Sequence, residues 1–210
     1  MPQTLAISEH LKSLAEVETT FGLHPNSDRL FFTEWSEDLP ELTEEEVARL
    51  NLFKQRYLYH RKHGAIAEGA VNFIIMSPLL EMAGFYDPLY LLQSEVSVNI
   101  EVEDLDVVYR GRIDTLVLQE RLWVVLLESK RSTFSFDMAI PQALSYMVSH
   151  VQGDRPVFGL VSNGRQFMFI KLMQQMGLQY SLSDEFSLYR QRNELWDVLK
   201  ILKRLGEIEL

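Results

Sequence analysis

Residues 111–130 read GRIDTLVLQERLWVVLLESK, two apolar runs on either side of the polar residues 119–121. Runs of this length around a polar turn predict a β-hairpin. Charged residues interrupt both runs: Asp114 lies in the first, and Glu128 and Lys130 lie at the end of the second. Because charged groups are costly to bury unless they are paired or bind a metal, we expect this hairpin to carry a site.

The expected pairing of the two strands brings the three charged groups to one face. Side chains alternate between the faces of a strand, so Glu128 and Lys130, two residues apart, share a face. With the turn at 119–121, residues pair across the hairpin when their numbers sum to about 240, which sets Asp114 opposite Leu126 and diagonal to Glu128. Two carboxylates and one amine on the same face of an apolar ribbon predict a metal site.

Length and composition narrow the class of protein and the chemistry of the metal site. The 210 residues suit one sizeable domain, and a hydrophobic fraction of 47% predicts a packed globular protein. The sequence contains no cysteine, which excludes disulfides and thiolate metal ligands. A metal would therefore be held by oxygen or imidazole, a donor set that favours Mg²⁺ or Mn²⁺ over structural zinc.

The charge of the chain is unevenly distributed. The formal net charge is −10, which argues mildly against a protein that coats DNA through electrostatic attraction. Residues 1–50, however, hold eleven acidic and three basic side chains, whereas residues 51–210 carry a net charge of only −2. Nucleic-acid binding near the hairpin is therefore not excluded.

No stretch of the sequence has the features of a membrane span or a signal peptide. It contains no run of 18 apolar residues and no charged-then-apolar leader. We therefore expect a cytoplasmic protein without a membrane partner.

Hydrophobic periodicity and capping signals predict a mixed β-sheet core flanked by helices in one α/β domain. A capping box at Thr43 and the Asn163-Gly164 turn are the clearest local signals. Three aromatic residues, Phe31, Phe32 and Trp35, lie in an irregular segment and are expected to pack on the core. Helices are predicted over 8–20, 43–62, 65–83, 135–151 and 188–205, and strands over 93–100, 107–118, 122–130, 156–161, 165–172 and 178–182.

The charged hairpin also matches a known motif. Asp114, thirteen intervening residues and then Glu128-Ser129-Lys130 resemble the core signature of the PD-(D/E)xK nuclease superfamily, with Ile113 at the position that gives the signature its proline. The resemblance implies a restriction-endonuclease-like fold.

Three further segments add to this resemblance. Glu68, with Asn72 four residues later, lies on the predicted helix before the sheet, as in many members. Gln142 and Tyr146 form a QxxxY motif that resembles the nuclease domains of type I restriction enzyme motor subunits, and at i and i+4 they share a helix face. The segment 159–172, GLVSNGRQFMFIKL, resembles the strand-turn-strand ending of the same domains.

The resemblance covers about residues 60–172 and implies a Mg²⁺- or Mn²⁺-dependent nuclease. It divides the chain into an N-terminal helical extension packed on the core, residues 1–62, and a nuclease-like domain, residues 63–210. The implied catalytic residues are Asp114, Glu128 and Lys130; the implied metal ligands are Glu68, Asp114, Glu128 and the backbone carbonyl of Ser129; and the residues that place substrate are Gln142 and Tyr146.

The implied substrate is DNA rather than RNA, in a restriction or repair setting. Arg61, Lys62 and Arg131 are the candidate DNA contacts. The chain has no Walker-type phosphate loop and is therefore not a complete motor subunit. The resemblance leaves open a homodimer and partner subunits of a restriction or repair system.

Other interpretations account for parts of the pattern. The charged trio could be a solvated ion pair on an edge strand, and Tyr146 a core aromatic residue. The basic stretch that includes Arg61 and Lys62 could be a solvated helix face. A non-catalytic domain of the same fold, used for binding or assembly, is the main alternative function, and an unrelated α/β ligand-binding protein is a third.

Overall fold

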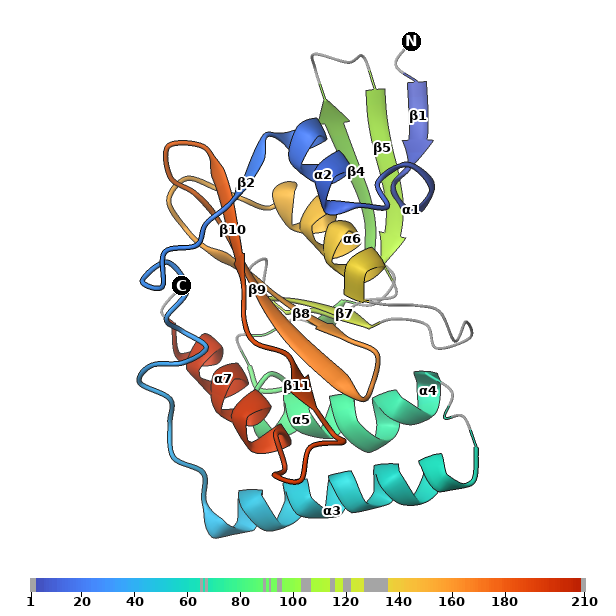
Figure 1. Cartoon of the computed structure of the whole chain (residues 1–210), viewed down its shortest axis with the longest axis vertical. Coiled ribbons are helices and arrows are strands. Elements are labelled where there is room, and N and C mark those ends of the chain that lie inside the picture. Colours follow the sequence, from blue (N-terminus) through green and yellow to red (C-terminus); the bar gives the residue numbers. More distant parts are fainter. Residues whose placement is uncertain are drawn as a thin grey trace.

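The computed structural model describes most of the chain, and the elements discussed below belong to its described part (Figure 1). The described residues are 3–64, 66, 68–88, 90, 92–93, 96–102, 107–113, 116–118, 122–126 and 136–208. The helices are α1 (Ile7–His10), α2 (Leu14–Phe21), α3 (Glu44–Lys62), α4 (Glu68–Val71), the π-helix η1 (Asn72–Met76), α5 (Ser77–Met82), α6 (Phe136–Val148) and α7 (Leu195–Glu207).

The strands form two sheets of mixed direction, as the α/β prediction requires. A three-stranded sheet has the order β1-β5-β4, and the larger sheet runs β2-β10-β9-β8-β7-β6-β3, with β11 also paired to β9. The strands are β1 (Gln3–Ala6), β2 (Leu23–Pro25), β3 (Leu92–Gln93), β4 (Val96–Val102), β5 (Val107–Ile113), β6 (Leu116–Leu118), β7 (Leu122–Leu126), β8 (Val157–Ser162), β9 (Gln166–Gln174), β10 (Leu178–Leu182) and β11 (Phe186–Ser187).

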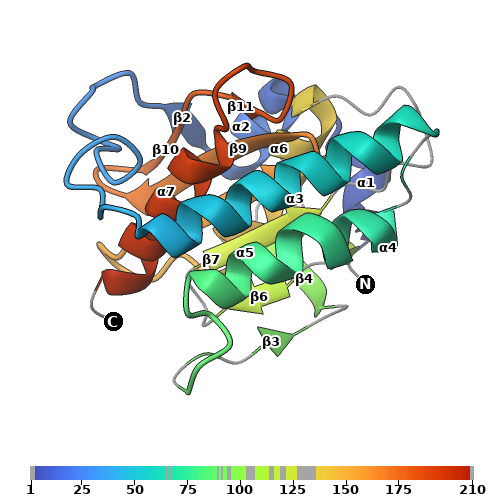
Figure 2. The ribbon, with the colours of Figure 1, turned by 90° about the horizontal axis from the view of Figure 1, so that it is seen from below.

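Helices cover both faces of the larger sheet, with α3, α5 and α7 on one side and α2 and α6 on the other (Figures 1 and 2). The alternation of side chains along β8 builds the two cores. Phe158 and Leu160 belong to the cluster under α3, η1, α5 and α7, whereas Val157 and Val161 belong to the cluster under α6. The central strands are therefore buried on both faces.

The predicted hairpin register is confirmed where the structure describes it. Leu116 pairs with Val124, and Leu118 pairs with Leu122, so the residue numbers of each pair sum as expected. The single strand predicted over 107–118 is wrong, because β5 pairs with β4 in the small sheet and β6 pairs with β7 in the large one.

Two helix starts also differ from prediction. Ser13, not Ser8, caps the first long helix, and it forms a capping box with Glu16; the predicted stop at Gly22 is confirmed by its left-handed backbone, φ 63°. The last helix begins at Leu195 rather than at 188, because β11 and a loop precede it. The capping box at Thr43 and the extent of α3 are confirmed.

The N-terminal segment is joined to the sheets by strands that the sequence did not predict. β1 pairs in parallel with β5, and β2 pairs in parallel with β10. The expected aromatic packing is present: Phe31 and Phe32 are buried, and Trp35 packs against the same core. Next to them Glu34 accepts a hydrogen bond from Lys171 of β9 at 2.5 Å.

Candidate functional site

The carboxyl ends of β7 and β8 lie side by side. The two strands are parallel, and the last residue of β7, Leu126, pairs with the last residue of β8, Ser162. Ligand sites in α/β sheets form where loops leave the carboxyl ends of parallel strands. Glu128 and Lys130 follow β7 in the sequence by two and four residues, and the Asn163-Gly164 turn follows β8 directly.

The turn after β8 is fixed by hydrogen bonds of its own side chains. The side-chain oxygen of Asn163 accepts hydrogen bonds from the backbone N–H groups of Arg165 (3.2 Å) and Gln166 (3.0 Å). The buried hydroxyl of Ser162 accepts from the N–H of Gly164 at 3.0 Å and donates to the carbonyl of Gln166 at 2.9 Å. Such local side-chain bonds define a single turn conformation.

The same turn packs against the helix that begins with Glu68. Gly164 has φ +81°, and a Cβ atom at this position would lie 2.3 Å from Cγ1 of Val71, the last residue of α4. Only glycine combines this backbone conformation with this close approach. The turn therefore seats α4 beside the carboxyl ends of β7 and β8, which brings the helix of Glu68 to the predicted site.

The helix after α4 carries an unsatisfied polar group. The π-helix η1 begins at Asn72, and π-turns inside helices occur frequently at functional sites. The side-chain oxygen Oδ1 of Asn72 is buried and has no hydrogen-bond partner. Leaving a buried acceptor unpaired costs about 1–3 kcal/mol. Asn72 lies four residues after Glu68 and offers an oxygen that can accept from a bound water.

The QxxxY pair of α6 is formed as predicted. Nε2 of Gln142 donates a hydrogen bond to the hydroxyl of Tyr146 at 2.9 Å. Tyr146 is buried in the core, whereas Gln142 is half-buried. α6 approaches β8 closely because Gly159 has no side chain; a Cβ atom there would lie 2.9 Å from the sulfur of Met147. Of the pair, only Gln142 is exposed enough to contact a substrate.

Several predicted site residues lie outside the described residues: Asp114, Glu128, Ser129, Lys130 and Arg131, and also the side chain of Glu68. Within the described part of the chain, no group of three or more His, Asp or Glu side chains could hold a metal ion. The predicted donors are three carboxylates and one carbonyl, an all-oxygen set that suits Mg²⁺ or Mn²⁺. The orphaned oxygen of Asn72 adds a donor of the same kind, so the residues fit such an ion.

The predicted DNA contacts Arg61 and Lys62 are exposed in the last turn of α3. One guanidinium nitrogen of Arg61 donates a hydrogen bond to the carbonyl of Gly64 at 3.2 Å. Lys54, about two turns earlier on the same helix, has a different environment, because its ammonium donates to three carbonyls of the loop before α7. Sequence reasoning missed this loop because the contact spans more than 130 residues.

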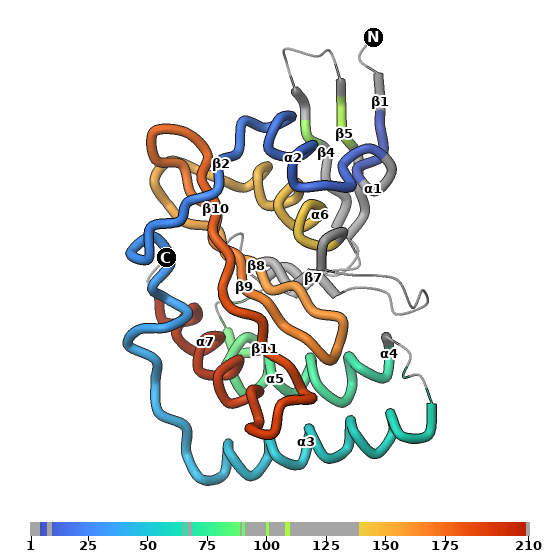
Figure 3. Tube along the Cα trace, in the orientation of Figure 1, coloured from blue at the N-terminus to red at the C-terminus, as the bar shows by residue number. Residues whose placement is uncertain are grey.

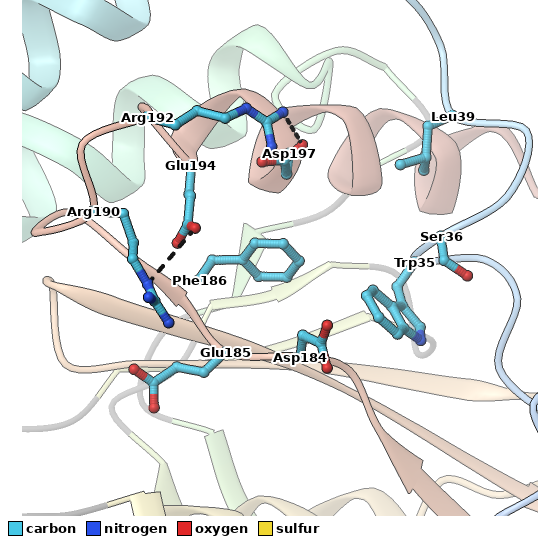
Figure 4. A pocket seen from close by; sticks show the side chains of 10 residues that line it. All are labelled: Trp35, Ser36, Leu39, Asp184, Glu185, Phe186, Arg190, Arg192, Glu194 and Asp197. Carbon is cyan, nitrogen blue, oxygen red and sulfur yellow. Dashed lines mark hydrogen bonds and ion pairs between the residues drawn. The ribbon is translucent and has the colours of Figure 1, made fainter.

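A separate cavity of about 600 Å³ lies between β11, the loop before α7 and the segment around Trp35 (Figure 4). Its charged groups largely pair with one another: Arg192 contacts Asp197 at 2.7 Å, and Arg190 lies 4.0 Å from Glu194. These pairs are drawn as dashed lines in Figure 4. Asp184 and Glu185 form neither of these pairs, so the groove keeps an acidic character that does not favour a phosphate, and the candidate site remains at the ends of β7 and β8.

The architecture is that of an α/β domain with helices on both faces of a mixed sheet. The family model for the N terminus of type I restriction enzyme R proteins matches residues 32–175, and the chain belongs to this family, a PD-(D/E)xK nuclease-like domain. The match confirms the resemblance and extends it toward the N terminus to include α3. No curated protein matches the chain. Among the described residues, no helix has the length and hydropathy that a membrane crossing requires.

Proposed function

We propose that the chain is a metal-dependent nuclease that hydrolyses phosphodiester bonds in DNA. The observation that carries this proposal is the contact between Gly164 and Val71, which seats the helix of Glu68 beside the carboxyl ends of β7 and β8. The described strands that flank Asp114 and Glu128 in the sequence support the same location, because Leu116 follows Asp114 by two residues and pairs with Val124 of β7, and Leu126 precedes Glu128 by two. The type I restriction family supports DNA as the substrate and partner subunits in a restriction or repair system.

The register of the described strands supports the proposed ligand set. Leu126 pairs with Ser162, and Leu116 pairs with Val124, so even-numbered positions of β6, β7 and β8 form one series. In β8 this series contains Phe158 and Leu160, which face α3, η1 and α5. If the series continues, residues 114, 128 and 130 share the face on which Glu68's helix packs.

We propose that Glu68, Asp114, Glu128 and the carbonyl of Ser129 hold one or two Mg²⁺ or Mn²⁺ ions. Such an ion lowers the pKa of a bound water and offsets the negative charge of the phosphate when it is bound. The role proposed for Asn72 is to accept a hydrogen bond from a water in this site, which would satisfy its buried oxygen.

The remaining residues act on the substrate. Lys130 stabilises the negative charge that develops on the phosphate and helps orient the attacking water. Gln142 contacts the nucleic-acid strand or a bound water through the face that remains half-exposed. Tyr146 is a positioning residue, because its buried hydroxyl accepts the hydrogen bond that holds Gln142.

The test compares cleavage and metal binding in two site variants and a matched acid-to-amide control. Wild-type protein, Asp114→Asn and Lys130→Ala are incubated with supercoiled, linear and single-stranded DNA in Mg²⁺ or Mn²⁺. Asp154→Asn is the control, because Asp154 is exposed in the loop before β8, at the opposite end of that strand. Calorimetric titration with Mn²⁺ provides a readout that does not require turnover.

We expect the control to cut DNA like the wild type, and both site variants to lose at least 100-fold in rate, the usual scale for an acid–base or charge-stabilising group. Asp114→Asn should also weaken Mn²⁺ binding. Equal cleavage by wild type and site variants would show a contaminating activity. Absence of cleavage together with unchanged Mn²⁺ binding would favour a non-catalytic domain of the same fold.

A further inference from the structure

Two arginines and a tyrosine from three different elements gather around the buried Tyr57 of α3. Arg61 lies one turn after Tyr57 on the same helix, Arg165 lies in the β8–β9 turn, and Tyr189 follows β11. Burial raises the pKa of the Tyr57 hydroxyl, Tyr189 raises it further, and the charges of Arg61 and Arg165 lower it, as expected if all three side chains lie near.

This cluster is continuous with the proposed nuclease site. The N–H of Leu188 donates a hydrogen bond to the carbonyl of Arg165 at 2.8 Å. This bond holds the start of the loop after β11 against the β8–β9 turn. The β8–β9 turn also contacts Val71 of α4 through Gly164. Figure 1 shows the end of α3, α4 and the β8–β9 turn on the same side of the molecule.

The loop that carries Tyr189 is held in place by α3. The ammonium of Lys54 donates to the carbonyls of Arg190 (2.6 Å), Gln191 (3.4 Å) and Arg192 (3.1 Å). Tyr189 itself is anchored by its N–H, which donates to the hydroxyl of Ser187 at 3.3 Å. Figure 3 shows this loop against α3. The backbone is thus ordered before any ligand arrives, which lowers the entropic cost of binding.

The cluster presents charge and an aromatic surface to solvent. Tyr189 is 52% exposed, a large fraction for an aromatic side chain on an anchored loop. Arg61 and Arg165 are exposed, and within the described residues neither takes part in an ion pair. The nearby acid Glu185 accepts a hydrogen bond from Gln166 at 2.7 Å. Each guanidinium donates one hydrogen bond to a neighbour, Arg61 to the carbonyl of Gly64 at 3.2 Å and Arg165 through Nε to the side-chain oxygen of Gln166 at 3.0 Å. Two exposed arginines whose charge no acid of the described residues pairs therefore accompany an exposed ring.

We propose that Arg61, Arg165 and Tyr189 form a binding track for single-stranded DNA that leads to the candidate nuclease site. The guanidinium groups would bind successive phosphates, and the ring of Tyr189 would stack on an unpaired base. The direction toward cleavage rests on the proposed function. Tyr189 lies beyond the residues 32–175 that match the family, so this part of the track belongs to the chain's own C-terminal segment.

The test is fluorescence anisotropy with a labelled oligo-dT strand in EDTA, which measures binding without cleavage. The variants are Arg165→Gln, Tyr189→Ala and Tyr189→Phe. Arg155→Gln is the control, because Arg155 is an exposed arginine in the loop before β8, at the end of that strand remote from Arg165. Circular dichroism and the melting temperature of each variant establish that it is folded.

Loss of one phosphate contact should reduce the slope of log K against log salt by about 0.7 in Arg165→Gln. Loss of stacking in Tyr189→Ala should weaken binding roughly 5- to 150-fold, the equivalent of about 1–3 kcal/mol per base. Tyr189→Phe keeps the ring and should bind within about twofold of the wild type, as should the control.

The outcomes separate the track from the nuclease. Wild-type affinity in both Arg165→Gln and Tyr189→Ala, or undetectable binding by the wild type, would overturn the track even if Asp114→Asn abolishes cleavage. Conversely, the predicted losses of affinity in a protein that never cuts DNA would retain the track and overturn the nuclease. If Tyr189→Ala weakened the binding of a double-stranded duplex as much as that of oligo-dT, this result would also contradict the proposal, because a paired base cannot stack on Tyr189.

Discussion

Replacing Gly164 by alanine tests the contact that assembles the candidate site. The backbone of Gly164, at φ +81°, disfavours a side chain by about 1 kcal/mol. The new Cβ would also lie 2.3 Å from Cγ1 and 2.8 Å from Cγ2 of Val71, both far inside contact distance. Overpacking of a buried position costs about 1–3 kcal/mol. We expect Gly164→Ala to lower the free energy of unfolding by about 3 kcal/mol.

A glycine elsewhere isolates the backbone part of this cost. Gly153 has φ +57°, and nothing lies within 4 Å of a Cβ atom built on it, so Gly153→Ala should cost about 1 kcal/mol. For a chain of this length 1 kcal/mol corresponds to about 2–4 °C in melting temperature. Gly164→Ala should therefore melt about 6–12 °C below the wild type, and Gly153→Ala about 3 °C below it.

The steric part is identified by a double-mutant cycle with Val71→Ala, which removes both clashing methyl groups. In that background Gly164→Ala should cost only about 1 kcal/mol, a coupling of about 2 kcal/mol between the two positions. Urea denaturation followed by circular dichroism measures all four proteins. Equal costs for the two glycine variants, or the same cost with and without Val71, would show that the turn does not support α4.

Two further predictions concern buried polar pairs. Lys171→Met leaves Glu34 buried without its partner and should lower the free energy of unfolding by about 3 kcal/mol, whereas the double variant with Glu34→Leu should recover most of it in urea denaturation. Burial and the hydrogen bond to Glu18 raise the pKa of Tyr180 above its usual value of about 10. The protonated hydroxyl therefore stabilises the folded state fully below pH 10, and this stabilisation declines as the pH rises toward the folded-state pKa. Tyr180→Phe should show a shallower loss of stability between pH 9 and 11; an unchanged alkaline slope would contradict this assignment.

Local signals predicted the parts of the fold that depend on neighbouring residues. The polar turn at 119–121 set the register of β6 and β7, and Thr43 with Glu46 set the start of α3. Each signal depends on side chains only a few positions apart, so it determines the local structure with little influence from tertiary packing. The Asn163-Gly164 turn was recognised for the same reason.

Long-range contacts explain what the sequence did not predict. The last helix starts at Leu195 because the preceding loop is held by Lys54, a residue more than 130 positions away. The π-helix η1, which begins at Asn72, divides the helix predicted over 65–83, and no local sequence signal marked it. The meeting of Gly164 with Val71 has no sequence signal at all. The motif residues were therefore recognisable, but the packing that supports their site was not.

The net charge of −10 is a poor guide to nucleic-acid binding by this chain. The first turn of α3 is acidic and its last turn is basic, and over 19 residues the two ends lie about 28 Å apart. At physiological salt, electrostatic interactions are screened over about 8 Å, so the two ends act independently. At the acidic end Glu46 and Glu41 pair with Lys203 and Lys200 of α7. Two of the eleven acids in residues 1–50 thus hold α3 and its preceding segment against α7, while the basic end of α3 lies beside the proposed site.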